Sequence, residues 1–159
     1  MRKLKITAIV LCIIVLSGVL AACGSSAIPQ PTVGSNVTTI DITGSCEMKV
    51  DGSTITVTGE TSFISDTNIS ISVVAQSGLV IDSVTVVQPD SGIVEAVFQI
   101  ADGDYKNVES ITGFITVSPS KQHEDAVAEY GAQFEKISSA TVWNKDGNVV
   151  MFSSEPYEF

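Results

Sequence analysis

The sequence has few of the residues from which active sites and metal centres are built. It contains one histidine, one tryptophan and three cysteines in 159 residues, and eight lysines and arginines face 18 aspartates and glutamates. Nucleic-acid binding needs clustered cations, so a formal net charge of −10 argues against that partner. A single histidine also leaves little material for a zinc site or a histidine-based catalytic apparatus. The length predicts one domain with a hydrophobic core of its own.

The first 22 residues have the three parts of a secretory signal. A basic start (Arg2, Lys3 and Lys5) is followed by an uncharged apolar run over 6–20 and then by small residues. An uncleaved transmembrane helix is the alternative interpretation, because the run is close to the length that a membrane span needs. The break at Ser17-Gly18 and the polar sequence that follows residue 23 favour cleavage.

The segment Leu20-Ala21-Ala22-Cys23-Gly24 resembles the lipobox of bacterial lipoproteins. In that family the cysteine thiol takes a diacylglyceryl group, and the signal is cleaved just before it. The resemblance implies that residues 1–22 are a signal peptide and that Cys23 is the lipid-attachment residue. Two acyl chains suffice for stable anchoring, so the resemblance also implies a location at the extracytoplasmic face of the cell membrane. No further cofactor is expected.

A spacer is expected between the lipid and the folded part. Residues 24–37 read GSSAIPQPTVGSNV, without charge and without periodicity. Such Gly-, Ser- and Pro-containing sequence is typical of flexible linkers. We therefore divide the chain into a signal peptide over 1–22, a lipidated N-terminus and spacer over 23–37, and a domain over 38–159.

Strands dominate the pattern of this domain. Apolar and polar residues alternate over 54–58, 68–73, 94–100 and 111–117, and Asp-Gly and Ser-Gly turns separate the runs. Alternation of this kind is typical of antiparallel strands with one buried face. In Leu79–Val87 the apolar phase switches near Asp82-Ser83, which predicts either a bulge or a strand buried on both faces.

One helix and one hairpin are expected near the C-terminus. The pattern predicts a short helix over about 121–134, with Ser120 as a possible cap and Gly131 as a possible early end. A hairpin is predicted over about 140–153, around the turn Lys145-Asp146-Gly147.

The segments Val50–Val57 and Ile100–Tyr105 are similar to parts of bacterial immunoglobulin-like and fibronectin-III-like modules. The resemblance covers about residues 46–118. It implies an all-β fold, an antiparallel immunoglobulin-like β-sandwich, to which the helix and the hairpin are additions. It also makes Tyr105 the candidate for a tyrosine corner. The paired cysteines and core tryptophan of antibody domains are missing, so only the sandwich carries over.

Cys46 is the one cysteine expected to remain after signal removal and lipidation. It cannot form an intramolecular disulfide, and the sequence has no CxxC motif that would indicate redox activity. A reactive or intermolecular thiol is one interpretation. A small, half-buried residue at the start of a strand is the favoured one.

The sequence predicts none of three kinds of catalytic or metal site. His123 lies at the start of the expected helix without an orienting partner nearby in sequence. A pair of carboxylates would need a cleft, which small sandwiches without long loops seldom form. Asp102, Asp104, Asn107 and Glu109 offer oxygen ligands for calcium, but their spacing is not that of an EF-hand and a hairpin turn explains them.

The leading functional expectation is a non-enzymatic, membrane-tethered lipoprotein that serves as a binding or structural module of the cell envelope. Its partners would be the membrane, through the lipid on Cys23, and a protein or cell-wall component that the sequence does not identify. The first alternative is a glycan-binding module that uses Trp143 with the nearby aromatics Tyr157 and Phe159, since sugar faces stack on flat rings. The second alternative is a lipid-anchored hydrolase, with a cleft where two acids or His123 converge.

Overall fold

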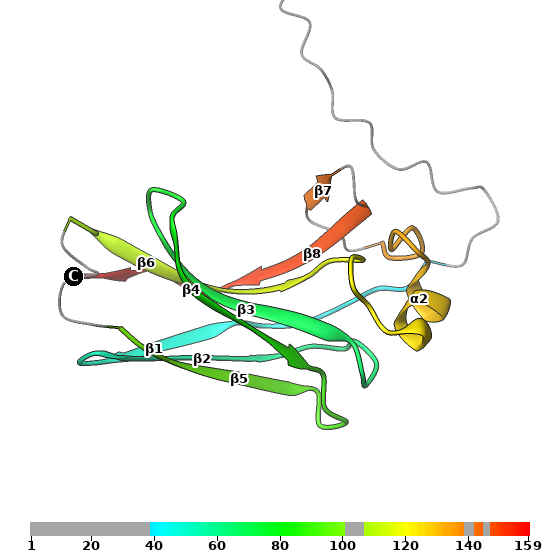
Figure 1. Ribbon diagram of the computed structural model, residues 1–159, viewed down its shortest axis with the longest axis horizontal. Helices are drawn as coiled ribbons and strands as arrows, with labels where there is room; N and C mark the ends of the chain where they lie inside the picture. The colour runs from blue at the N-terminus through cyan, green and yellow to red at the C-terminus, as the bar shows by residue number, and fades with distance from the viewer. Residues whose placement is uncertain (1–38, 101–106, 139–141, 145–146) are drawn as a thin grey trace, which may run out of the picture.

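Two antiparallel sheets stack face to face in the computed structural model, which describes residues 39–100, 107–138, 142–144 and 147–159 (Figure 1). The smaller sheet has the order β1-β2-β5, with β1 at Glu47–Asp51, β2 at Thr54–Glu60 and β5 at Ile93–Gln99. The larger sheet has the order β4-β3-β6-β8-β7, and β9 also pairs with β6. Its strands are β3 (Asn68–Ala75), β4 (Val80–Val87), β6 (Ser110–Val117), β7 (Val142–Asn144), β8 (Gly147–Ser153) and β9 (Tyr157–Glu158).

The expected fold class, an all-β antiparallel sandwich, is confirmed. The chain crosses between the sheets from β2 to β3, from β4 to β5 and from β5 to β6, as in immunoglobulin-like sandwiches. All named strand pairs are antiparallel. Tyr105, the candidate for a tyrosine corner, lies outside the described residues.

The core between the sheets comes from the alternation of the central strands. On β2, β3 and β6 every second residue is fully or almost fully buried. The residues with no exposed surface on these strands are Ile55, Val57, Ile69, Ile71, Val73, Ile111, Ile115 and Val117. The strands predicted over 54–58, 68–73, 94–100 and 111–117 are therefore confirmed, with small differences at their ends. Strand β9 was not predicted, and β1 was expected only through the interpretation of Cys46 as the start of a strand.

Strand β4 contains the predicted bulge. Val73 on β3 pairs with Asp82 and the next residue, Val74, pairs with Val80, so Ile81 is the extra residue. The other interpretation, burial on both faces, is wrong, because most of β4 is exposed. The bulge next to Asp82 explains the switch of apolar phase in the sequence.

The helix is shorter than predicted, and α2 spans only Glu124–Tyr130. Its N-cap is His123 rather than Ser120, because Lys121 has a left-handed backbone with φ 64° that a helix cannot include. The hydroxyl of Ser120 instead lies 2.9 Å from that of Ser118. The end at Gly131, with φ 91°, is confirmed, and the continuation to residue 134 is wrong.

Helix α2 closes one end of the sandwich with an aromatic cluster. Tyr130 meets Phe63 and Phe134 edge to face, at ring-centroid distances of 5.3 and 5.7 Å. The Tyr130 hydroxyl accepts a hydrogen bond of 2.7 Å from the Ile64 N–H, and burial raises the pKa of this phenol. The chain enters the sandwich at the same end, where the Ile40 N–H donates to the Lys136 carbonyl at 2.7 Å.

The C-terminal hairpin is confirmed in the residues that the structure describes. β7 and β8 pair antiparallel, with Val142 opposite Val149.

The part of the chain that is described contains no helix long and apolar enough to cross a membrane.

Candidate functional site

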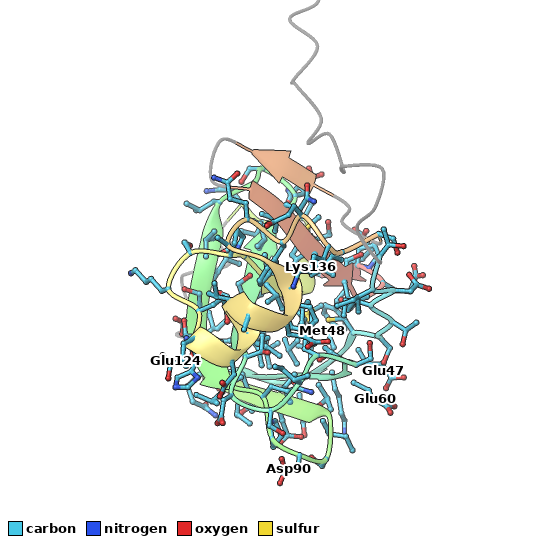
Figure 2. The ribbon with its side chains drawn as sticks, turned by 90° about the vertical axis from the view of Figure 1, so that its right-hand side faces the viewer. Glu47, Met48, Glu60, Asp90, Glu124 and Lys136 are labelled. Carbon is cyan, nitrogen blue, oxygen red and sulfur yellow. The ribbon has the colours of Figure 1, made fainter. Side chains whose placement is uncertain are left out.

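The two outer faces of the sandwich differ in charge. The outer face of the β1-β2-β5 sheet carries Glu47, Lys49, Asp51 and Glu95, whose side chains alternate with buried or half-buried ones. Figure 2, which views the molecule from the end that carries α2, shows Glu47 and Glu60 projecting from the same side. The acids of the described sandwich strands are thus concentrated on this sheet.

The outer face of the β4-β3-β6-β8 sheet carries no charged residue on these four strands, and the register places Glu158 of β9, opposite Ser110, at one edge of it. We call this surface the neutral face. The pairing register and the burial pattern assign to it Asn68, Ser70, Ser72, Val74, Val80, Ser83, Thr85, Val87, Thr112, Phe114, Thr116, Met151 and Ser153. Hydroxyl groups predominate, and Phe114 is the aromatic residue among them. The near absence of charge on this face contrasts with the 18 acids of the chain.

A row of hydroxyls crosses three strands of the neutral face. Ser70 on β3 lies opposite Thr85 on β4 and opposite Thr116 on β6. Strand spacing places neighbouring members of this row about 5 Å apart. Among the described residues, none makes a hydrogen bond with any of these three hydroxyls. They are therefore available to a ligand.

A hollow lies at the end of the neutral face where the row meets the loop between β6 and α2. Its volume is about 440 Å³, within the size range of small-ligand sites. Its lining residues are all of polar types, and one of them, Lys121, is charged. The lining residues are Asn68, Ser70, Thr85, Thr116, Ser118, Ser120, Lys121 and Gln122.

The loop wall of this hollow is fixed by side-chain amides. Gln122 Oε1 accepts a hydrogen bond from the Asn68 N–H at 2.8 Å, and Gln122 Nε2 donates to the carbonyls of Asn68 and Ser118 at 2.9 and 2.7 Å. Asn68 Nδ2 in turn donates to the Lys121 carbonyl at 2.6 Å. These bonds hold Lys121 in its left-handed conformation at the rim of the hollow.

A second hollow of about 310 Å³ is lined by Thr43, Gly44, Ser45, Glu60, Thr61 and Ser62. It contains one carboxylate. His123 lines neither hollow, and its Nδ1 lies 3.3 Å from a carboxylate oxygen of Asp125 in an exposed setting. Within the described residues, neither hollow brings two acids together or includes His123, as the hydrolase alternative requires.

Cys46 lies just before β1 and is half-buried, which confirms the favoured interpretation of its position. Its Sγ donates to the Gly113 carbonyl at 3.5 Å. Burial, together with the charge of Glu47, raises the pKa of the thiol to about 11. At neutral pH the group is therefore a thiol rather than a reactive thiolate.

The aromatics of the proposed glycan platform are not brought together. Tyr157 pairs with Ile111 at the start of β6, and its ring meets that of Phe159 at 5.4 Å. Trp143 lies on β7, which pairs with the first residues of β8, 147–149. The next residue of β8, Val150, lies opposite Val117 at the end of β6. The length of β6 separates the two places by about 20 Å. In Figure 1 the C-terminus and β7 accordingly lie toward opposite ends of the sandwich.

Phe114 is the aromatic residue that sequence reasoning missed. Its neighbours on β6, Gly113 and Ile115, are buried, so the half-buried Phe114 projects from the outer face. It lies opposite Ser72 on β3 and opposite Ser153 on β8. The signal was present in the alternation, because the inward positions 111, 115 and 117 place residue 114 outward.

The other candidate sites fall largely outside the described residues. These include Cys23, and Asp102 and Asp104 of the calcium alternative. Asn107 and Glu109 are described, and no group of three potential metal-ligating His, Cys, Asp or Glu residues occurs in the described parts of the chain.

Comparison with known proteins adds no relative: no protein-family model matches the chain, and no match is found among curated proteins.

Proposed function

We propose that the protein is a non-enzymatic lipoprotein that binds a component of the cell envelope through its neutral face. In this proposal a lipid on Cys23 tethers it to the extracytoplasmic face of the membrane. The observation that carries the binding role is the contrast between the two outer faces. One carries several charged side chains, and the other carries, on its described strands, Glu158 at one edge. The tether rests on the lipobox resemblance at residues 20–24.

A face with little charge suits association because its water can be removed at a low cost in free energy. Burying a charged side chain without a partner carries a large desolvation penalty, whereas hydroxyls can exchange water for ligand hydrogen bonds. The central parts of protein interfaces are likewise depleted of charge. The row of Thr85, Ser70 and Thr116 and the adjoining hollow add hydrogen-bonding groups to this face.

The spacer gives the domain freedom to reach its partner. A flexible chain over 23–37 spans about 20 Å on average and at most about 50 Å. The described chain enters the sandwich beside Lys136 and Ser138, at the end that carries α2. In this arrangement that end, with the hollow beside it, lies nearer the membrane than the C-terminus does.

The tether is tested by the mass of the native N-terminus and by a single substitution. We expect the N-terminal peptide of the membrane-derived protein to begin at a diacylated Cys23. The variant Cys23→Ser should move from the membrane fraction to the soluble fraction or remain uncleaved. An unmodified thiol with residues 1–22 still attached contradicts the tether.

The binding role is tested by placing one charge on each outer face. Ser72→Glu adds a carboxylate to the neutral face, and Thr56→Glu adds the same group to the outer face of the β1-β2-β5 sheet. We expect Ser72→Glu to reduce retention of the protein on isolated envelope fragments and Thr56→Glu to leave retention unchanged. Equal retention of both variants and the wild type contradicts the role of the neutral face.

A further inference from the structure

We propose that the ligand of the neutral face is an uncharged glycan. In this inference, which rests on the proposed function, Phe114 stacks on a sugar ring while Thr85, Ser70 and Thr116 hydrogen-bond to sugar hydroxyls. The hollow beside Lys121 then receives one end of the bound segment.

The free hydroxyls match the chemistry of a sugar chain. A serine or threonine hydroxyl is both a donor and an acceptor, as is each hydroxyl of a sugar. The hydroxyls of Ser70, Thr85 and Thr116 make no hydrogen bond with other described residues, so a ligand need not displace an internal partner. Their regular arrangement over three strands presents repeated groups to a repeating polymer.

Phe114 supplies the apolar part of the match. The ring lies between Ser72 and Ser153 in the row next to that of Ser70 and Thr116, about 7 Å along the strands. Met151, opposite Thr116, extends the apolar surface toward β8. A sugar ring has an apolar face and polar edges. The phenyl ring of Phe114 is complementary to the apolar face, and the hydroxyls around it are complementary to the polar edges.

The charge distribution favours a neutral polymer over an anionic one. The chain has a net charge of −10, and the charged side chain in the hollow is Lys121 alone. An anionic polymer would be repelled by the field of the domain. A cationic polymer would be drawn to the acids on the outer face of the other sheet, around Glu47 and Glu95.

The composition of the neutral face favours a glycan over a protein. The energetic centres of protein interfaces are usually Trp, Tyr and Arg side chains, and the described neutral face contains none of them. Its most exposed apolar side chains, Val80 and Val87, lie on the outermost strand β4 rather than at its centre. The centre of the face is formed by Ser70, Ser72 and Phe114.

The probes are the uncharged hexasaccharides cellohexaose, chitohexaose and maltohexaose, with hexagalacturonate as the anionic comparison. Binding is measured by calorimetry on the full chain in detergent. We expect at least one neutral probe to bind. Phe114→Ala should weaken that binding about tenfold, and Thr116→Val several-fold, through loss of the stacked ring and of one hydrogen bond. Phe114→Leu keeps an apolar side chain without a ring face, and should weaken binding even if the alanine variant folds poorly.

Matched controls lie on the other sheet. Val97→Ala removes apolar surface and Thr56→Val removes a hydroxyl from the outer face of β5 and β2, and both should leave binding unchanged. The inference is overturned if no neutral hexasaccharide binds, if hexagalacturonate binds more tightly, or if Trp143→Ala abolishes binding that Phe114→Leu retains. If Ser72→Glu abolishes envelope retention while no sugar binds, the glycan inference fails and the proposed function stands.

Discussion

The side-chain amide of Gln122 pairs with the backbone of Asn68 in both directions. Oε1 accepts from the Asn68 N–H at 2.8 Å, and Nε2 donates to the Asn68 carbonyl at 2.9 Å. The amide thus makes with the first residue of β3 the pair of hydrogen bonds that a neighbouring strand makes with residues farther along β3. Because Gln122 belongs to the loop before α2, this pair joins the sheet to the loop and forms one wall of the hollow.

The isosteric variant Gln122→Glu tests this pairing. The carboxylate cannot donate to the carbonyls of Asn68 and Ser118, and it places a negative charge beside them. We expect the free energy of unfolding to fall by about 1–3 kcal/mol at pH 7, as measured by urea denaturation. Protonation restores one donor, so part of the loss should be recovered near pH 4 relative to the wild type at the same pH.

Gln99→Glu is the matched control, because Gln99 is exposed on the outer face of β5 and its side chain bonds to that of Thr54. Its effect should stay within about 0.5 kcal/mol. Equal losses of unfolding free energy in both variants would show that the pairing of Gln122 with Asn68 stabilises the fold no more than an exposed side-chain hydrogen bond does.

The sequence predicted the strands that have one face entirely toward the core and the other entirely toward water. Ile69, Ile71 and Val73 alternate with polar residues on β3, because one side meets the core and the other meets water. β1 does not show in the alternation, because it is an edge strand where Met48 and Val50 are only half-buried between charged residues. Its pattern is therefore weaker than that of a central strand.

The candidate site was less predictable than the fold. The pairing of Gln122 with Asn68 joins residues 54 positions apart, and only the sheet register brings them together. The hydroxyl row likewise depends on the register of three strands. The outward position of Phe114 was available from the alternation, but its serine neighbours Ser72 and Ser153 come from other strands.

The phenol of Tyr130 should contribute to stability through its hydroxyl as well as its ring. Tyr130→Phe keeps the contacts with Phe63 and Phe134 and leaves the Ile64 N–H without its acceptor. We expect a loss of about 1–2 kcal/mol in the free energy of unfolding. The control Tyr157→Phe changes an exposed phenol and should have little effect.

The stabilities of Tyr130→Phe and the wild type should also depend differently on pH in alkaline solution. Burial raises the pKa of Tyr130 above its ordinary value of 10.0, so the folded state retains the proton more strongly than the unfolded state. Its contribution is fully present below pH 10 and is lost as pH rises through the folded pKa. The gap in stability between wild type and Tyr130→Phe should therefore narrow above pH 10, and a constant gap would contradict this role.

Cys46 should react slowly with alkylating reagents in the folded protein. Its pKa of about 11, against an ordinary 9.0, leaves a thiolate fraction about a hundredfold lower at pH 8. Mass spectrometry of the peptide that contains Cys46, after timed treatment with iodoacetamide, measures this rate. The chain unfolded in urea is the control and should react at the ordinary rate, while equal rates would contradict the protection.

The raised pKa of Cys46 also makes a prediction about stability. The folded state favours the protonated thiol, so this contribution is present below pH 9 and is lost as pH rises toward 11. Cys46→Ala removes the titrating group. The stability of the wild type should therefore decline more steeply between pH 9 and 11 than that of the variant, as measured by urea denaturation at each pH.

Strand β4 is an edge whose composition favours pairing with another chain. It is the outermost strand of its sheet, and Val80, Val84 and Val87 are 54%, 41% and 55% exposed. Its single charge is Asp82, beside the bulge at Ile81. Charges and bulges prevent edge-to-edge association, so the first half of β4 is protected and the second half, from Ser83 to Val87, is open.

Val84→Lys places a charge in the open half of β4 and should slow aggregation. We expect a lower rate of light scattering on heating below the unfolding transition, with a stability change of at most about 1 kcal/mol. Val97→Lys is the matched control, because it adds the same charge to β5, the edge strand of the other sheet that already carries Glu95. If both variants slow aggregation equally, the open edge of β4 is not the cause of aggregation. The change in net charge does not explain such slowing, because each lysine brings the net charge of −10 closer to zero and weakens the repulsion between copies.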